Sequence, residues 1–284
     1  MKRTMVFGLL LGAITAGSFG ADNDGTFSYR LGQFEVHMLV DAQREGNTGI
    51  LIGADQALLA RYIPAGGFMH STNVFLVKTP EQTILIDTGF GTVIFDKMSD
   101  LGVEPEDIDV VLITHLHGDH IGGLQRNGTA LFPNAKVYVS SREHEYFTRT
   151  QVNQGAVTAL AAYGSNVITF EPSQLGSTLR ELLPGITAIA NYGHTPGHTV
   201  FLVQNGGARL IIAGYFLHVA LVQFPNPDIS ATFDVDPTAA AASRRQILAW
   251  AAANRVPIAG MHIVYPGIGI VEAEGNGYRF IPVR

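Results

Sequence analysis

Apolar and polar positions alternate in two characteristic ways along this chain. Short runs rich in valine, isoleucine and phenylalanine, mostly bounded by turn residues, are typical of buried strands. In the first half they predict strands at 73–78, 83–86 and 109–113. In the second half the same pattern predicts strands at 186–191, 200–204, 210–213, 256–259 and 269–274.

Helical patterns separate these strands. Residues 91–101 and 141–149 are predicted to be helical, and Ser141 can cap the first turn of the second helix. A third helix is predicted from Asp236-Pro237-Thr238 to Ala253, with Asp236 as N-cap and Pro237 at the first helical position. Two sets of strands with covering helices favour a layered α/β domain. Periodicity alone does not separate a doubly wound sheet from a four-layer sandwich.

The first residues follow a different pattern. Lys2 and Arg3 are basic, residues 5–14 are largely apolar, and Ser18-Phe19-Gly20 has small residues at the spacing of a cleavage site. This pattern predicts a signal peptide over 1–21 and one domain over 22–284, located in the periplasm or secreted. The apolar stretch is shorter than the roughly 20 residues of a membrane span, so no stable membrane anchor is expected.

Composition narrows the chemistry. The 284 residues are 46% apolar and 15% charged, as in a globular protein with a sizeable core. A net charge of −6 without a basic stripe disfavours nucleic acid as a partner. There is no cysteine, which excludes disulfides and thiolate ligands. Any metal must therefore bind to nitrogen and oxygen.

Four potential metal ligands lie within six residues, directly after the strand predicted at 109–113. They are His115, His117, Asp119 and His120. On an extended segment, His115 and His117 project to the same side, while Asp119 and His120 follow where the chain turns into a helix. Imidazole and carboxylate suit zinc, manganese, iron or cobalt. Ordinary packing or capping does not explain so many histidines in one loop.

This segment resembles the HxHxDH signature of the metallo-β-lactamase superfamily. Three other motifs agree in order and spacing: 86–89 (Ile-Asp-Thr-Gly), 193–199 (Gly-His-Thr-Pro-Gly-His-Thr) and 260–262 (Gly-Met-His). The resemblance spans most of the chain, from about Thr72 to Gly269, and implies an αββα sandwich. It also implies a metal pocket at one edge, between the two sheets. The stretch from Gly214 to Arg244 is most similar to the methyl parathion hydrolase and secreted lactonase-like branch.

The resemblance also implies roles for residues. His198 would be the third nitrogen ligand of one metal position, and His262 would belong to the second position. Asp119 is the candidate proton shuttle, and Asp87 and Thr114 are expected to orient the imidazole rings from behind. His194 and His218 also flank the site and are interpreted as pocket or structural histidines.

One expected ligand is missing. Where the family has an aspartate that bridges two metals, this chain has Tyr215. Loss of a carboxylate leaves about one more positive charge uncompensated, which lowers metal affinity. Three outcomes stay open: Tyr215 binds as a phenolate; it stands aside and one metal remains on His115, His117 and His198; or the metal binds too weakly for turnover.

The predicted function is metal-dependent hydrolysis of a small neutral ester, lactone or phosphotriester, in which a bound cation lowers the pKa of water. The expected cofactor is one or two divalent metal ions per chain, with zinc as first choice and manganese, cobalt or iron as alternatives. A homodimer is compatible with the sequence. The alternative from another class is an impaired or non-catalytic binding protein of the same fold, for which Tyr215 is the main argument.

Overall fold

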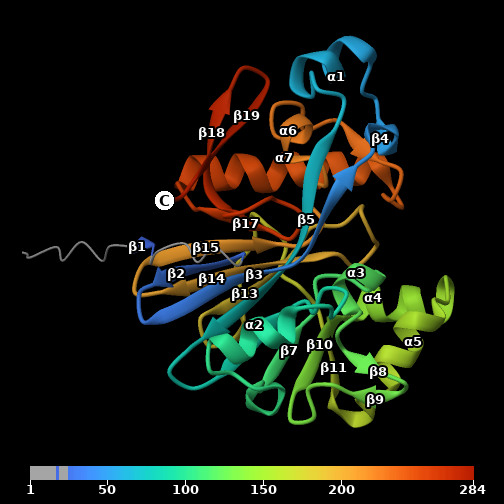
Figure 1. The fold of residues 1–284 in the computed structure, drawn as a ribbon, viewed down its shortest axis with the longest axis vertical. Helices are drawn as coiled ribbons and strands as arrows, with labels where there is room; N and C mark the ends of the chain where they lie inside the picture. Colours follow the sequence, from blue (N-terminus) through green and yellow to red (C-terminus); the bar gives the residue numbers. More distant parts are fainter. Residues whose placement is uncertain (1–16, 19–24) are drawn as a thin grey trace, which may run out of the picture.

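Two mixed β-sheets form the centre of the molecule (Figure 1). The structure, a computed structural model, describes residues 17–18 and 25–284. The first sheet has the strand order β1-β2-β3-β5-β6-β7-β10-β11. Its strands are β1 (Gly17–Ser18), β2 (Thr26–Leu31), β3 (Phe34–Gly46), β5 (Phe68–Lys78), β6 (Thr83–Ile86), β7 (Val110–Leu112), β10 (Lys136–Ser140) and β11 (Val167–Phe170).

The second sheet has the order β12-β13-β14-β15-β17-β18-β19. Its strands are β12 (Glu181–Leu183), β13 (Ile186–Ala190), β14 (Thr199–Asn205), β15 (Ala208–Ala213), β17 (Ile258–Gly260), β18 (Ile268–Glu274) and β19 (Gly277–Pro282). Most neighbours are antiparallel, but in the first sheet β6, β7, β10 and β11 pair in parallel, and in the second sheet β15 pairs in parallel with β17. Parallel neighbours end at the same sheet edge, so the loops that follow them lie side by side.

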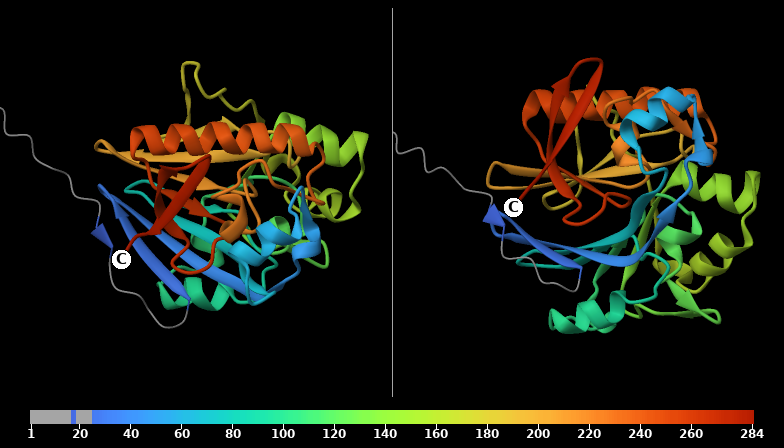
Figure 2. Two further views of the ribbon diagram at one scale, coloured as in Figure 1. Left: turned by 90° about the horizontal axis from the view of Figure 1, so that it is seen from above. Right: turned by 45° about the horizontal axis from the view of Figure 1, so that its top comes forward.

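Helices cover the outer face of each sheet (Figures 1 and 2). The helices on the first sheet's side are α2 (Ile94–Asp100), α3 (Gly118–Ile121), α4 (Ser141–Glu145) and α5 (Gln154–Ala161). The second sheet is covered by the long α7 (Pro237–Asn254). Short elements complete the chain: η1 (Thr48–Ile50), β4 (Leu51–Ile52), α1 (Gln56–Tyr62), η2 (Pro105–Asp107), β8 (Gln125–Arg126), β9 (Thr129–Ala130), η3 (Tyr146–Thr150), η4 (Gly164–Asn166), α6 (Ala220–Gln223) and β16 (Ser230–Ala231).

Three apolar cores hold these layers together. Residues of both sheets, such as Phe75 and Phe201, are fully buried in the core between the sheets. A second core packs the first sheet against its helices, and a third packs Ile247 and Leu248 of α7 against the second sheet. Burial of apolar surface on both faces of both sheets is what makes four layers stable. The predicted αββα sandwich is confirmed.

The predicted elements agree well with the structure, and the main differences are at their ends. The strand predicted at 73–78 begins earlier, at Phe68, and the helix predicted at 141–149 divides into α4 and a π-helical turn, η3. The predicted signal peptide lies outside the described residues except for 17–18, and it stays a prediction. Among the described residues, no helix is long and apolar enough to cross a membrane.

Candidate metal centre

The loop from β7 to α3 brings four side chains to the edge of the first sheet. His115 and His120 are buried, whereas the side chain of Asp119 keeps 27% of its exposure. His117 stands at the N-cap of α3 in an extended conformation. The sharp change from strand to helix therefore places all four groups on one side of a short loop.

A first group of three nitrogens converges on one point. Nε2 of His194 lies 3.0 Å from Nε2 of His115 and 3.0 Å from Nδ1 of His117. His194 comes from the loop between β13 and β14, in the second sheet. Three ligand atoms this close could hold one cation such as zinc.

A second group lies beside the first. Nε2 of His120 is 3.3 Å from Nε2 of His262, and Oδ2 of Asp119 is 3.6 Å and 3.7 Å from these two nitrogens. His262 follows β17 after one intervening residue, Met261, again at the edge of the second sheet. These distances fit a second cation with two imidazole ligands and one carboxylate ligand.

The prediction that His198 is a metal ligand is not supported by the structure. Its Nδ1 donates to the backbone oxygen of Asn191 at 2.9 Å, and its Nε2 accepts from the backbone N–H of Tyr215 at 2.8 Å. Both ring nitrogens are therefore occupied by backbone groups. His194, interpreted from the sequence as a pocket or structural residue, brings its Nε2 to His115 and His117 instead. A single metal at this position would therefore bind His115, His117 and His194 rather than His198.

A glycine makes this arrangement possible. Gly193 has φ of 125°, and a Cβ there would collide with the backbone of Ala240 at the start of α7. Only glycine adopts such a conformation without strain, so the loop can pass close to α7 and turn His194 inward. This close approach explains why the residue before His194 is glycine.

Hydrogen bonds from behind orient the ligand rings. Nδ1 of His120 lies 2.5 Å from Oδ2 of Asp87, and the carboxylate of Asp87 also accepts from the N–H and hydroxyl of Thr114. Nδ1 of His262 donates to the backbone oxygen of Ser71. In each ring, a proton on Nδ1 leaves the Nε2 lone pair for a cation. The structure places Asp87 and Thr114 where the sequence predicted supporting residues.

Asp234 is a supporting residue that the sequence prediction did not single out. Its Oδ1 lies 3.0 Å from Nδ1 of His194, and its Oδ2 accepts from the N–H of Ala231. Asp234 is 40 residues away from His194 along the chain. No local motif marks such a distant pair.

Burial sets the charge of the centre. It lowers the pKa of His117 and of His262 to about 4, and the pKa of His194 well below its ordinary value. Burial also acts to lower the pKa of His120, but Asp119 and Asp87 outweigh it and raise that pKa. Burial works to raise the pKa of Asp119, yet His120 and His262 bring it down to about 2. At neutral pH His117, His194 and His262 are therefore neutral imidazoles and Asp119 is an ionised carboxylate, the protonation states that bind metal, whereas the raised pKa of His120 favours its protonated form until a metal displaces the proton.

Glu143 in α4 is hydrogen-bonded to two loops, the one that follows β7 and the one that carries His194. It is a second residue that the sequence prediction missed. It is fully buried. Its carboxylate accepts from the N–H of Leu116, between His115 and His117, and from the hydroxyl of Thr195 and the N–H of Gly197. One carboxylate thus ties the loop of the first sheet to the loop that carries His194.

Tyr215 lies against both ligand groups. Its ring stacks on His194, with centroids 3.7 Å apart, and meets His262 edge-on at 5.1 Å. Its hydroxyl is buried without a hydrogen-bond partner. Burial raises the pKa of Tyr215 well above 10. Without a metal, the side chain of Tyr215 is therefore a neutral phenol that packs against His194 and His262.

The two ligand groups border a cavity of about 490 Å³. Its lining includes polar groups of the centre and apolar rings: Arg44, Glu45, Gly46, Asn47, Ile50, His70, Thr72, Phe90, His117, Gly118, Asp119, His194, Tyr215, His218 and Phe233. A cavity of this size accommodates a small organic molecule. The donor set fits divalent zinc, cobalt, iron or manganese, since it consists of imidazoles and a carboxylate held at ligand spacing.

Curated proteins are similar to parts of this chain. The N-acyl homoserine lactonase of Bacillus cereus is 26% identical over 164 residues, 49% of this chain and 60% of that protein. The exodeoxyribonuclease WalJ of Streptococcus pneumoniae is 32% identical over 89 residues, 30% of this chain and 33% of that protein. The matched part of the chain thus spans less than two thirds of the length of these curated relatives.

Solved structures match over more of the chain. The hydrolase AbOPH of the β-lactamase superfamily has a TM-score of 0.83 and 28% identity, covering 93% of this chain and 99% of that chain. The dizinc quorum-quenching lactonase AidC has a TM-score of 0.80 and 24% identity, covering 95% and 98%. Residues 68–252, well over half of the chain, match the family model of the metallo-beta-lactamase superfamily. This protein belongs to the metallo-β-lactamase superfamily.

Proposed function

We propose that this protein is a metal-dependent hydrolase whose substrates are small neutral esters, with lactones first among them and phosphotriesters next. The observation that carries the proposal is the pair of ligand groups beside one cavity, His115, His117 and His194 next to Asp119, His120 and His262. The N-acyl homoserine lactonase of Bacillus cereus, which is similar to part of this chain, supports lactones as substrates, and the similar hydrolase AbOPH supports hydrolysis as the reaction.

A divalent cation bound at such ligands lowers the pKa of a bound water and polarises a carbonyl or phosphoryl group. The chain's own residues hold the cation and orient the imidazole rings that bind it. Asp234 and Asp87 fix the rings of His194 and His120, so that the ligand nitrogens face the cavity side of the centre. Buried rings such as Tyr215 restrict water beside the reacting group, which strengthens electrostatic interactions there.

Asp119 is the acidic side chain of the two ligand groups, and it also lines the cavity. Its pKa of about 2 keeps the carboxylate ionised at neutral pH, so it can hold a cation and accept a proton from an attacking water. A pKa this low also makes it a weak base. We therefore propose that binding the cation is its first task and proton transfer its second.

Arg44 suits the expected product. It lines the cavity, and its guanidinium lies over the ring of Phe90 at 4.6 Å. Hydrolysis of an ester or lactone produces a carboxylate, and an arginine at the wall of the cavity attracts such an anion. The same wall offers apolar rings, Phe90 and Phe233, to the neutral part of the substrate.

The test is hydrolysis by the purified protein after metal removal and reloading with zinc, cobalt or manganese. A γ-lactone, an aryl ester and an aryl phosphotriester serve as probes, and the His194→Ala variant is the control. Activity that depends on metal, exceeds the control and is highest for the lactone supports the proposal. A metal-loaded protein that hydrolyses none of the three faster than His194→Ala overturns it and favours a binding protein.

A further inference from the structure

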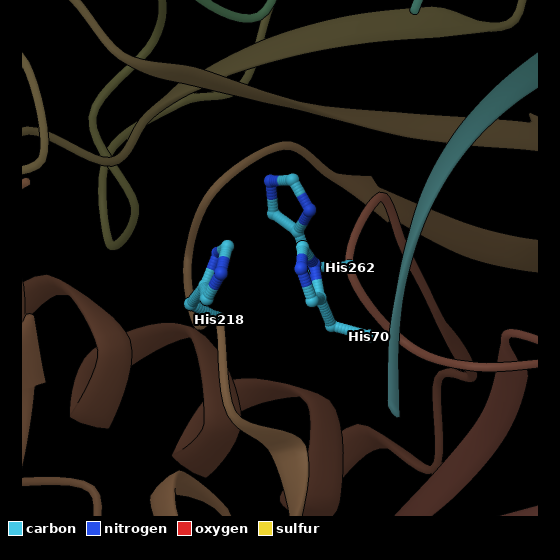
Figure 3. A group of neighbouring side chains, drawn as sticks. All are labelled: His70, His218 and His262. Atoms are coloured by element: carbon cyan, nitrogen blue, oxygen red, sulfur yellow. The ribbon is translucent and has the colours of Figure 1, made fainter. Parts of the chain in front are cut away.

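A third group of histidines, drawn in Figure 3, shares His262 with the second ligand group. His70 comes from β5, His218 from the segment between β15 and α6, and His262 from the turn after β17. The ring centroid of His218 lies 4.7 Å from that of His70 and 4.7 Å from that of His262. One nitrogen of each ring lies within 4.8 Å of the others. We call these three residues the histidine triad.

The triad has unused ligand capacity. Nδ1 of His70 and Nδ1 of His218 are buried and have no hydrogen-bond partner. His218 itself is only 8% exposed. A buried imidazole nitrogen without a partner lacks the compensation that buried polar groups normally have. Packing therefore does not account for two such nitrogens in neighbouring rings, and a cation bound through them would give each a partner.

His262 limits how the triad can be used. Its Nδ1 is already hydrogen-bonded to the backbone oxygen of Ser71, so Nε2 is the nitrogen open to a cation. That same Nε2 is the one that lies 3.3 Å from Nε2 of His120. Because one nitrogen lone pair binds one cation, His262 can serve either the triad or Asp119 and His120, but not both at once.

We propose that the histidine triad is an alternative position for the second cation, which competes with Asp119 and His120 for His262. This inference rests on the proposed function, because it concerns the same metal-dependent centre. The protein then holds two cations in total, one at His115, His117 and His194 and one that has two neighbouring positions. Tyr215, stacked between His194 and His218, lies beside all three positions.

The ligands of the triad define which cations it takes. Three neutral imidazoles without a carboxylate suit zinc, cobalt, nickel and copper, and are poor ligands for manganese or magnesium. The Asp119 position has a carboxylate and accepts manganese more readily. The triad is also reached from two sides, since His70 lines the main cavity and His262 lines a second cavity of about 500 Å³, while His218 borders both.

The experiment measures zinc content and position in variants of the full chain. His120→Ala and, separately, Asp119→Asn each remove one ligand of the Asp119 position and leave the triad intact. Each variant is expected to keep about two zinc ions per chain, with anomalous diffraction at the zinc edge placing the second ion among His70, His218 and His262. Adding His218→Ala to either variant should lower the content to about one ion.

The outcomes separate the two proposals. If His120→Ala and Asp119→Asn, folded by circular dichroism, each bind about one zinc ion, the triad proposal is overturned while the hydrolase proposal stands. The triad is also overturned if the second ion survives the added His218→Ala, because it is then bound elsewhere. His144→Ala, which removes a histidine of α4 outside the three groups, is the matched control and should leave the zinc content unchanged. A wild-type protein that binds no zinc and hydrolyses nothing overturns both.

Discussion

Each buried imidazole near the centre has two ring nitrogens, and the partner of one decides what the other can do. In His194, Asp234 faces Nδ1 and leaves Nε2 to the centre. In His198, four residues later, backbone groups occupy both nitrogens. The two residues belong to the same motif and are both buried. Their different functions follow from hydrogen bonds, which spacing in the sequence does not encode.

Exchange of these two histidines for alanine should therefore have different effects. His194→Ala removes a ligand and should lower the metal content at the first position. His198→Ala leaves two backbone groups without partners, which should cost about 1–3 kcal/mol of stability and leave the ligands in place. Metal analysis and thermal unfolding of both variants check this. Equal loss of metal in the two variants, with His198→Ala still folded, would contradict the assignment.

Asp234 should control metal affinity without contacting the metal. Asp234→Asn weakens the hydrogen bond that holds Nδ1 of His194, and we expect metal affinity to fall about 10- to 100-fold. Asp236→Asn is the matched control, because Asp236 caps α7 and asparagine also caps helices well. Competition with a chelator of known affinity measures both. An Asp234→Asn affinity equal to that of Asp236→Asn would show that Asp234 has no orienting role.

Two substitutions of Tyr215 should have different effects, one on metal binding and one on stability. Tyr215→Asp places a carboxylate beside both ligand groups, and we expect more metal per chain and faster hydrolysis, since it offsets cationic charge. Tyr215→Phe removes a buried hydroxyl that has no partner, so the metal-free protein should be as stable as the wild type or slightly more so. Loss of metal in Tyr215→Phe would show instead that the phenol oxygen is a ligand.

At the scale of elements, apolar periodicity predicted what a strong local pattern specifies. Strands such as β6 and β15, and the helix α7 with its Asp236 cap, were predicted nearly to their ends. The hairpin of β2 and β3 and the short helix α5 were not predicted, because their stability depends on packing against distant residues. The site followed the same rule. The dense loop after β7 was recognised, whereas Asp234 and Glu143 act across the fold and were missed.

Glu143, which connects the loop after β7 to the loop that carries His194, should make the free energy of unfolding depend on pH. Burial raises its pKa to about 7, against three hydrogen bonds that stabilise the ionised form. The folded state therefore holds the proton more tightly than the unfolded chain, whose glutamate has an ordinary pKa of 4.5. This stabilisation is complete below pH 4.5 and is lost as the pH rises toward 7, with a slope of at most about 1.4 kcal/mol per pH unit.

Glu143→Gln cannot ionise and should lack this pH dependence. In metal-free protein, the free energy of unfolding of the wild type should fall relative to that of Glu143→Gln between pH 5 and pH 7 or so. Glu145→Gln, an exposed residue of the same helix, is the control and should follow the wild type. Urea unfolding at several pH values measures the difference. A difference that does not change with pH would show that Glu143 is ionised throughout.

At the scale of the whole molecule, the centre joins the two sheets. His115, His117, Asp119 and His120 come from the first sheet, whereas His194 and His262 come from the second. The core between the sheets is apolar and Glu143 already connects two of the loops. A cation held at either group therefore adds a bond across the interface of the two halves. Unfolding separates these halves and must release the cation.

Metal should consequently raise thermal stability by mass action. A ligand that binds only the folded state adds about 2.7 kcal/mol at 100 times its Kd, which corresponds to a rise in Tm of roughly 5–10 °C for a chain of this size. Zinc added to chelator-treated protein should produce this shift, and it should increase with zinc concentration. His115→Ala/His262→Ala, which removes one ligand from each group, should lose the shift. A Tm that zinc leaves unchanged, while zinc is bound, would mean that the ligands do not link the two sheets.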